Sequence, residues 1–318
     1  MAEIALYPIM LKPALHTRVW GGRRLETAMG KALPTDEPYG ESWEMHDTSV
    51  VANGGYAGKT VAETLTIMGE ALVGAGNPVN QGMPLLAKIL DASDWLSVQV
   101  HPNDAQASAL EGEPRGKSEA WIVLAADPGA RIVIGVAPGT TREAMADAIH
   151  SNNLEALLVY QEVVAGDVLN VAANTVHALG PGLLIYEIQQ SSDVTYRLYD
   201  WGRMGLDGKP RALHVEKGVQ VAETRFVPAI SHPDPDADFV EMVRSDYFVT
   251  SQAALHESPV AFDTGGRFQI ITCIEGEGVV RAGGGSVVFS KGQTLLIPAA
   301  CPLFSLRGEG RVLISQQP

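Results

Sequence analysis

Short apolar runs separated by glycine and proline are the feature that most constrains the fold of this sequence. The 318 residues include 33 glycines and 19 prolines, which interrupt the apolar runs along most of the chain. Short apolar runs bounded by turn-forming residues are typical of β-strands, whereas a helical bundle needs longer uninterrupted patterns. The runs that we expect to form strands are residues 96–100, 130–136, 167–171, 182–188, 269–274, 286–289 and 294–297. The sequence therefore predicts a mainly β protein.

Two segments depart from this pattern and predict short helical insertions. Residues 60–73 and residues 141–161 carry apolar side chains at helical spacing. The second segment opens with Thr140 and Thr141 followed by Glu143, an arrangement typical of a capped helix start. We expect each segment to be a helical insertion in the β fold.

A polar, proline-containing segment at residues 231–238 divides the chain and is typical of a linker. The length suits two domains, because a domain commonly has about 150 residues. We therefore expect an N-terminal domain over residues 1–230, with helical insertions at about 60–75 and 140–161, and a C-terminal all-β domain over residues 239–318.

A weak internal repeat relates the two expected domains. In the first, His177 follows Gly166 by eleven residues, and in the second, Leu303 follows Gly292 by the same interval. Both segments resemble the second motif of cupins, in which a glycine turn and a strand lead to a metal-ligand position. This resemblance implies two jelly-roll β-barrels. Because the ligand position holds histidine only in the first copy, we expect a metal-binding N-terminal barrel and a metal-free C-terminal barrel.

Residues 96–104, with the sequence LSVQVHPND, carry polar side chains in alternation with valines. Alternate residues of a strand share one face, so we expect Ser97, Gln99 and His101 to point the same way. Val98 and Val100 then point to the opposite, apolar face. Polar groups inside a barrel need partners, and a metal ion with a sugar is one way to supply them.

Two further segments supply candidate ligands for the same metal. Residues 116–121 form a strand-like run that offers Glu119, and His177 stands at the end of its own strand. Two imidazoles, a carboxylate and an amide oxygen suit zinc and leave room for water or substrate. Each residue by itself is more typical of a structural role. Their combination around one cupin-like motif favours a metal site.

Several segments together resemble the type I mannose-6-phosphate isomerases in their short bacterial form. The similarity covers most of residues 7–220 in the right order and is thin beyond residue 240. SVQVHPND and GKSEAW together are its most specific part. Ser118 stands where larger relatives often carry proline, and Ala172 replaces the usual proline of the cupin turn, changes expected to affect loop shape more than chemistry. The segments that carry the similarity are residues 20–22, 41–44, 88–91, 96–104, 116–121 and 193–197.

The resemblance implies an enzyme that interconverts mannose 6-phosphate and fructose 6-phosphate through a cis-enediol. It implies one zinc ion per chain, with four ligands: Gln99, His101, Glu119 and His177. It also implies that Arg197 reaches into the same pocket, where a permanently charged guanidinium would stabilise an enediolate.

The remaining site residues have less definite roles. Lys117 or Glu187 would transfer the proton, and the sequence does not decide between them. Lys88 and Ser97 match positions associated with phosphate binding, and we assign Glu41 and Trp20 to substrate binding as well. Each has a structural alternative: Arg197 could pair with Asp193 or Asp200 at the surface, Glu187 could be an internal partner of Arg197, and Lys88 could extend its head to solvent.

Charge limits the expected partners to small molecules. The formal net charge is −14, which disfavours nucleic acid and anionic membrane surfaces. A sugar phosphate requires only a local group of lysines and arginines. The N-terminus has no basic region followed by a long apolar run, and no segment approaches the roughly 18 apolar residues of a membrane span. We expect a cytoplasmic monomer or homodimer, with Cys273 and Cys301 as buried apolar side chains.

Two other classes of protein remain open on the sequence alone. One is a sugar-binding or regulatory cupin without catalysis, which the complete set of inferred site residues argues against. The other is an iron-dependent cupin dioxygenase, for which Gln99 is a poorly suited ligand.

Overall fold

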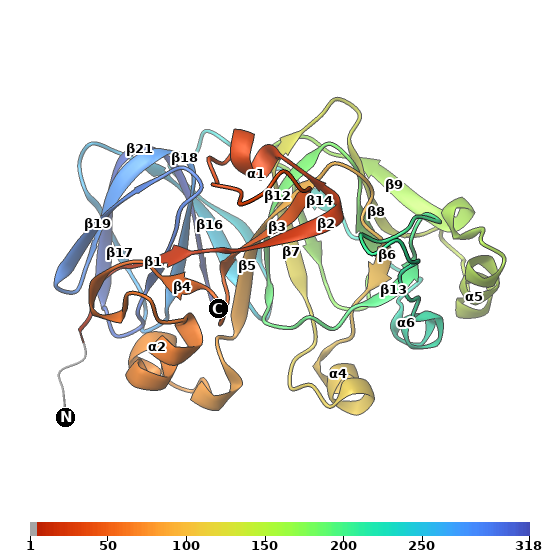
Figure 1. Ribbon diagram of the computed structural model, residues 1–318, viewed down its shortest axis with the longest axis horizontal. Helices are drawn as coiled ribbons and strands as arrows, with labels where there is room; N and C mark the ends of the chain where they lie inside the picture. The colour runs from red at the N-terminus through yellow and green to blue at the C-terminus, as the bar shows by residue number, and fades with distance from the viewer. Residues whose placement is uncertain (1–4) are drawn as a thin grey trace.

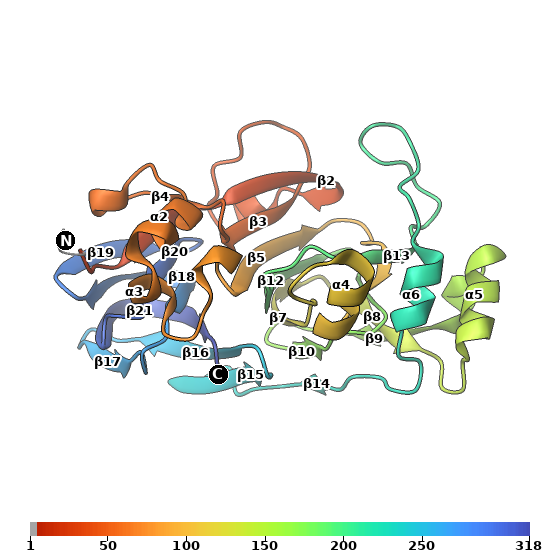
Figure 2. The same ribbon diagram turned by 90° about the horizontal axis from the view of Figure 1, so that it is seen from below.

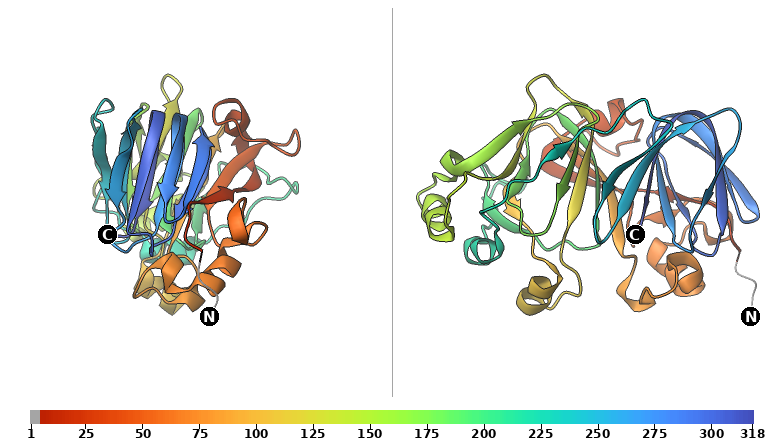
Figure 3. Two further views of the ribbon diagram at one scale, coloured as in Figure 1. Left: turned by 90° about the vertical axis from the view of Figure 1, so that its left-hand side faces the viewer. Right: turned by 180° about the vertical axis from the view of Figure 1, so that it is seen from behind.

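The protein consists mainly of antiparallel strands arranged as two β-barrels that lie side by side along the long axis of the molecule (Figure 1). The structure is a computed structural model, and it describes residues 5–318. The expected fold class, a mainly β protein with short helical insertions, is confirmed. The two barrels are seen from the end and from behind in Figure 3.

The first barrel packs a seven-stranded sheet against a five-stranded sheet. Leu90, Trp121 and Ile185 of the larger sheet and Ile132 and Leu179 of the smaller one belong to one buried apolar cluster. The larger sheet contains β2 (Ala14–Gly22), β3 (Tyr39–Met45), β5 (Leu85–Ala92), β7 (Glu119–Ala126), β10 (Val168–Val171), β12 (Leu183–Gln190) and β14 (Ile230–Ser231). The smaller sheet contains β6 (Val98–Val100), β8 (Arg131–Val136), β9 (Leu158–Glu162), β11 (His177–Leu179) and β13 (Tyr196–Tyr199).

The second barrel is one nine-stranded sheet around an apolar core that includes Cys273 and Cys301, both fully buried as expected. Its longest strands pair with each other from Ile270 opposite Ser315 to Ala282 opposite Phe304. Its strands are β1 (Ile9–Lys12), β4 (Val50–Val51), β15 (Phe239–Arg244), β16 (Val249–Leu255), β17 (Val260–Asp263), β18 (Gln269–Ala282), β19 (Gly285–Ser290), β20 (Thr294–Ile297) and β21 (Leu303–Gln316).

Strand pairing crosses the expected boundary between the two parts of the chain. β1 pairs with β20 through Ile9 and Leu296, and β4 pairs with β1 through Val51 and Leu11. Two strands from the first 51 residues are thus part of the second barrel. The division into folding units at residues 1–230 and 239–318 stays a prediction. The nine-stranded sheet crosses this boundary, because it includes β1 and β4.

The internal repeat is visible in the strand order. Gly166 precedes β10 and Gly292 precedes β20, and both have positive φ, at 93° and 79°. Glycine adopts this conformation without the steric cost that a side chain would add. His177 then opens β11, and Leu303 opens β21 at the corresponding point.

Short helices lie mostly on one side of the molecule, where α2, α4 and α6 are seen below the barrels (Figures 1 and 2). The first predicted insertion is α2 followed by α3, and α2 begins at a capping box formed by Thr60 and Glu63. The helices are α1 (Arg24–Thr27), α2 (Val61–Met68), α3 (Glu70–Val73), α4 (Asp104–Glu111), α5 (Arg142–His150) and α6 (Val215–Val221), with 3-10 turns at η1 (Gly54–Tyr56), η2 (Val79–Gln81) and η3 (Leu154–Leu157).

The second predicted insertion is shorter than expected. Thr141 caps α5 as predicted by accepting a hydrogen bond from the Ala144 N–H, but α5 ends at His150, and Asn152 has φ of 54°. Residues 158–161 lie in β9, not in a helix. Leu158 packs against one apolar cluster and Val159 against another, so the side chains alternate with the period of a strand. The predicted linker likewise begins with Ser231 inside β14.

A buried polar network joins the two barrels. Lys31 Nζ lies 2.5 Å from Glu44 Oε1 and donates to the Gly292 carbonyl, also at 2.5 Å. Thr294 Oγ1 of β20 donates to Glu44 Oε2 at 2.9 Å, and Ser42 Oγ to Glu44 Oε1 at 2.6 Å. The charge of Glu44 is therefore compensated although its side chain is fully buried.

None of the helices in residues 5–318 has the length and apolar character to cross a membrane. The expectation about the N-terminal segment rests partly on residues 1–4, which lie outside the described residues.

Candidate active site and metal centre

Cross-strand neighbours place the candidate site residues in two rows. In the five-stranded sheet, Gln99 of β6 lies opposite His177 of β11 on one side and Arg197 of β13 on the other. In the seven-stranded sheet, Glu187 of β12 lies opposite Lys88 of β5. Side chains directly opposite each other on neighbouring strands are within contact distance. Residues far apart in the sequence are thereby gathered inside the first barrel.

The alternation predicted for residues 96–101 is present. Ser97 and Gln99 line a cavity inside the barrel, whereas Val98 and Val100 pack in an apolar cluster on the other side of β6. The polar row therefore faces the cavity.

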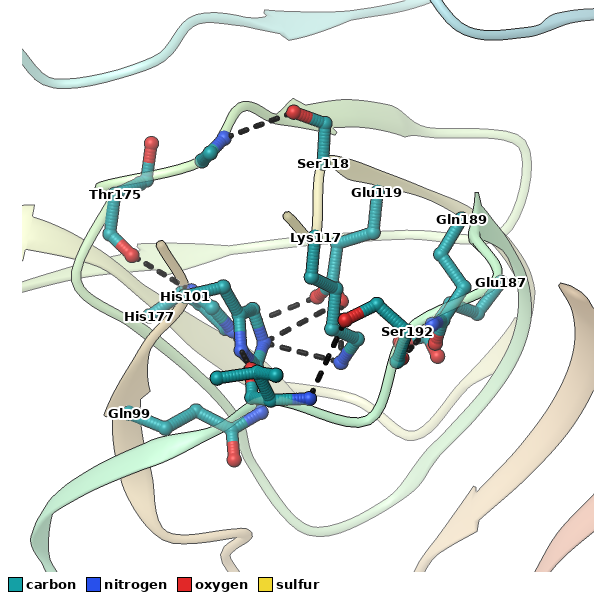
Figure 4. Close-up of polar contacts among 12 residues, drawn as sticks. Gln99, His101, Lys117, Ser118, Glu119, Thr175, His177, Glu187, Gln189 and Ser192 are labelled. Atoms are coloured by element: carbon teal, nitrogen blue, oxygen red, sulfur yellow. Dashed lines mark hydrogen bonds and ion pairs between the residues drawn. The ribbon is translucent and has the colours of Figure 1, made fainter. Parts of the chain in front are cut away.

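Three of the four predicted metal ligands converge in the interior (Figure 4). His101 Nε2 lies 3.5 Å from Glu119 Oε2, and His177 Nε2 lies 3.4 Å from Glu119 Oε1. All three side chains are buried, and their ligand atoms lie within 4.8 Å of one another. The fourth, Gln99, places its amide Nε2 3.3 Å from His177 Nε2. Rotating this amide by 180° about its terminal bond presents the oxygen there instead.

Backbone carbonyls hold both imidazoles in the form that binds metals. His101 Nδ1 lies 2.9 Å from the Val194 carbonyl, and His177 Nδ1 lies 2.8 Å from the Thr175 carbonyl. A carbonyl only accepts, so each Nδ1 carries the proton and each Nε2 keeps its lone pair toward Glu119. Burial lowers the pKa of both histidines, and Lys117 lowers that of His101 further. Both shifts favour the neutral form of the rings.

The Glu119 carboxylate shows that the cluster fits a cation. Within residues 5–318, the buried Oε1 has no hydrogen-bond donor, whereas Oε2 is paired with Lys117 Nζ at 2.8 Å, which also lies 3.0 Å from His101 Nε2. Burial alone would raise the pKa of Glu119, but the neighbouring Lys117 lowers it well below its usual range. A carboxylate, two neutral imidazoles and an amide oxygen form a donor set suited to zinc.

A cavity of about 630 Å³ adjoins this cluster. His101, Glu119 and His177 are in contact with Gln99 or Lys117, which belong to its wall. All the other predicted site residues are brought together here: Trp20, Glu41, Lys88, Ser97, Gln99, Lys117, Glu187 and Arg197 line the cavity.

Lys88 and Glu187 form a buried ion pair in the cavity wall, with 3.0 Å between Nζ and Oε1. Burial would lower the pKa of Lys88, but Glu187 and Glu41 raise it above its usual range. Burial and the nearby Glu119 raise the pKa of Glu187, and Lys88 opposes this shift. The indole N–H of Trp121 donates to Glu187 Oε2 at 3.0 Å. Glu187 is paired with Lys88, not with Arg197 as the structural alternative suggested.

Arg197 is held by the backbone and not by a carboxylate. Its Nη1 donates to the Ala212 carbonyl at 2.9 Å, and its buried Nε has no partner among the described residues. The surface pair with Asp200, the structural alternative for Arg197, does not form, because Asp200 accepts from Arg203 and Arg211. Burial and the neighbouring Arg211 lower the pKa of Arg197. Its guanidinium thus lines the cavity and keeps an Nε–H donor that no described residue accepts.

Glu41 is bound tightly by its neighbours. Arg18 donates to both carboxylate oxygens at 3.0 Å, and the Trp43 indole donates to Oε2 at 2.7 Å. Burial would raise the pKa of Glu41, but Lys88, Arg18 and these hydrogen bonds lower it to about 2. Trp20 is almost fully buried and lines the cavity.

Other cavity residues were not expected from the sequence. Arg18 precedes Trp20 by two positions in β2, so strand alternation from Trp20 could have indicated it. Arg211 lies in a glycine- and proline-containing loop, where no local pattern predicts which side chain turns inward. The unexpected lining residues that carry polar groups are Thr17, Arg18, Asp193, Thr195, Asp207 and Arg211.

Two family models match the chain. Residues 9–119 match the phosphomannose isomerase type I catalytic domain, and residues 238–317 match the mannose-6-phosphate isomerase cupin domain. The chain is 35% identical to the mannose-6-phosphate isomerase of Streptococcus mutans over 316 residues, which covers 97% of this chain and 98% of that protein. The mannose-6-phosphate isomerase ManA of Bacillus subtilis is also 35% identical, with 97% and 98% covered.

Solved structures show the same fold. The crystal structure of the mannose 6-phosphate isomerase from Bacillus subtilis superposes with a TM-score of 0.88 at 30% identity, covering 97% of this chain and 99% of that one. A mutant of the phosphomannose isomerase from Salmonella typhimurium superposes with a TM-score of 0.80 at 18% identity, covering 98% and 99%. At this lower identity the likeness concerns the fold alone.

Proposed function

The chain belongs to the type I mannose-6-phosphate isomerase family, and on this premise we propose that it interconverts D-mannose 6-phosphate and D-fructose 6-phosphate through a cis-enediol. The observation that carries the proposal is the buried cluster of His101, Glu119 and His177 beside a cavity of sugar-phosphate size. The arrangement of charged side chains around this cavity supplies the groups that such a reaction needs.

We propose that Gln99, His101, Glu119 and His177 hold one zinc ion per chain. Zinc bound by these residues supplies Lewis-acid polarisation of the substrate oxygens. The fixed Nδ1–H bonds of the two histidines orient their rings before any ion arrives. The buried Glu119 Oε1, which has no hydrogen-bond donor among the described residues, supports the same assignment.

We propose that Glu187 moves the proton between C1 and C2. Its pKa is raised by burial and by Glu119, and a carboxylate whose pKa lies closer to neutrality is a better general base. Lys117 remains the alternative, since it lines the same cavity and stands 2.8 Å from Glu119. Two variants distinguish these candidates for the proton carrier: Glu187→Gln and Lys117→Met. The measurement is exchange of the substrate C2 proton with solvent.

Arg197 is our proposed group for stabilising the enediolate. Its guanidinium is planar and has an unpartnered Nε, so hydrogen bonds to a developing oxyanion do not require breaking an ion pair.

Lys88 and Ser97 are our proposed phosphate contacts, with Glu41 and Trp20 as neighbouring substrate contacts. A phosphate beside Lys88 would share that ammonium group with Glu187. Arg197 in the same wall, which pairs with no carboxylate among the described residues, supplies further positive charge. The net charge of −14 is thus locally offset where a dianion would bind.

Metal analysis combined with a coupled assay on mannose 6-phosphate tests the proposal. Purified protein should hold about one zinc per chain, and His177→Ala should lose both metal and activity. Leu303→Ala is the matched control, because Leu303 occupies the corresponding position of the second barrel. A metal-free active enzyme, two tightly bound metals per chain, or iron with no isomerase activity would contradict it. Cytoplasmic location and a monomeric or homodimeric state stay predictions.

A further inference from the structure

Two of the segments that carry the metal cluster, those of His101 and Glu119, meet at one carboxylate, that of Asp104. This residue opens α4, three positions after His101. Its Oδ1 accepts from the backbone N–H of Gly116 at 2.7 Å and from Nε2 of Gln190 at 2.8 Å. Gly116 stands directly before Lys117, and Gln190 ends β12. One carboxylate therefore joins the turn after His101, the segment before Glu119 and the end of β12.

Gln190 extends this connection to the residue next to Glu119. Its Oε1 accepts from the Ser118 N–H at 2.9 Å, and its own backbone N–H donates to the Ser118 carbonyl at 3.0 Å. The amide of Gln190 is therefore fixed at one end by Asp104 and at the other by Ser118. The Gln190 side chain is almost completely buried, so water does not readily replace these bonds.

The close approach of the segments explains the glycine at position 116. A Cβ atom on Gly116 would lie 2.4 Å from the Asn103 carbonyl carbon and 2.6 Å from the Asp104 nitrogen. No side chain fits there without moving the backbone, so the segment that leads to Lys117 and Glu119 packs directly against the start of α4.

The second barrel contributes the third bond to this carboxylate. Tyr247, in the turn between β15 and β16, donates its hydroxyl to Asp104 Oδ2 at 3.3 Å. The turn is anchored, because the neighbouring Phe248 is fully buried in the apolar cluster shared by the two barrels. Residues of the first barrel in this cluster include Ala120, directly after Glu119.

We propose that Asp104 is a positioning residue for the metal centre, and that Tyr247 connects the C-terminal barrel to that centre through it. The ligands come from separate segments, so metal affinity depends on how firmly those segments are held relative to one another. Loss of residues outside the ligand shell commonly weakens metal binding by about 10- to 100-fold. This inference rests on the proposed metal-binding function.

The test is a Co²⁺ titration of the full-length apoprotein, followed by visible absorption, with Zn²⁺ affinity from competition against a chelator. Asp104→Ala should raise the Kd for either metal by about 10-fold or more and alter the Co²⁺ spectrum. Asp104→Asn keeps an oxygen acceptor and should restore most of the affinity. Tyr247→Phe removes a single hydrogen bond and should raise the Kd by about 2- to 10-fold. Glu143→Ala, in the first turn of α5, is the matched control and should bind like the wild type.

The outcomes separate this inference from the function on which it rests. If the wild-type protein takes up no metal, the proposed metal site itself fails. If the wild type binds metal and Asp104→Ala shows the same Kd and the same spectrum, the positioning role is overturned. Should Asp104→Ala not fold, Gln190→Met takes its place with the same expected loss, and an unchanged Kd overturns the role. An unchanged Kd in Tyr247→Phe overturns the connection to the C-terminal barrel.

Discussion

Lys88 and Glu187 face each other across β5 and β12, with 3.0 Å between their charged groups and almost no exposure to solvent. The pair gives each residue an influence on the other's protonation. Lys88 opposes the rise in the pKa of Glu187 that burial and Glu119 produce. Lys88, which we propose binds the phosphate, therefore also influences the pKa of Glu187, the proposed base.

Replacing Lys88 by methionine should move the acid limb of the kcat profile to higher pH. Without the ammonium group, the upward effect of burial and Glu119 on the pKa of Glu187 is opposed only by the smaller effect of Lys117. Because the base acts only as the carboxylate, activity is lost at a higher pH as the solution is acidified. A pH–rate profile of both proteins measures the shift. An unmoved limb would favour Lys117 as the proton carrier.

The Lys88→Met variant, assayed at a pH well above the acid limb, also tests the phosphate contact. Glu187 is then ionised in both proteins, so the remaining difference reports substrate binding. Loss of a charge-assisted hydrogen bond should lower kcat/KM for mannose 6-phosphate by roughly 10- to 150-fold. Unphosphorylated mannose, as the control substrate, should be almost unaffected. Equal losses for both substrates would remove Lys88 from the phosphate site.

Replacing Arg197 by lysine should lower kcat by about 100-fold or more, the scale of losing one oxyanion donor. Lysine keeps the positive charge but not the planar set of donors. Zinc content should not change, because the Arg197 side chain is held by the Ala212 carbonyl and is not itself a proposed ligand. Arg203→Lys is the matched control, since Arg203 binds Asp200 and Asp94 outside the cavity wall. Near-normal kcat in Arg197→Lys would rule out the proposed role.

Glu41 should contribute to stability in a pH-dependent way. Its pKa falls from 4.5 to about 2 in the folded protein, so its contribution is complete above about pH 5 and is lost as pH falls through about 2. The contribution is at most about 3 kcal/mol, and less to the extent that the partly exposed Arg18 is screened by water. Urea unfolding of the wild type and Glu41→Gln should show a stability difference that shrinks between pH 5 and pH 2. A constant difference would contradict this origin.

Breaking the buried pair of Lys31 and Glu44 should destabilise the protein strongly. Lys31→Met leaves Glu44 charged and fully buried, which commonly costs about 3–5 kcal/mol. The double variant Lys31→Met/Glu44→Gln keeps an acceptor for Ser42 and Thr294 and should recover part of the loss. Urea unfolding of the complete double-mutant cycle measures the coupling, and simple additivity would refute it. Arg244→Met, in the exposed pair with Glu241, is the control and should change little.

Local patterns predicted those parts of the site that depend on one strand. The alternation of Ser97, Gln99 and His101 follows from the two-residue period of a strand, and it holds in the structure. The position of His177 opposite Gln99 follows from pairing between segments almost 80 residues apart, which periodicity does not encode. The resemblance to a known family supplied that connection.

Local sequence patterns could not predict other features, for identifiable physical reasons. Residues 158–161 have apolar spacing compatible with a helix, but positive φ at Asn152 ends α5, and β8 offers strand partners. Arg211 enters the cavity from a loop whose path depends on tertiary contacts such as that between Arg197 and Ala212. The hydrogen bonds of Asp104 likewise require three segments to meet before any of them forms.

The pairing of β1 with β20 sets an order of events during synthesis on the ribosome. Ile9 is translated early, but its partner Leu296 is translated only when almost the whole chain has been made. Until then the edge of β1 that faces β20 has no partner, although β4 can already pair with the other edge, and the second barrel cannot close. The nascent chain must therefore keep one unpaired strand edge in solution through most of its elongation. Unpaired strand edges make incomplete multidomain chains prone to aggregation and dependent on chaperones.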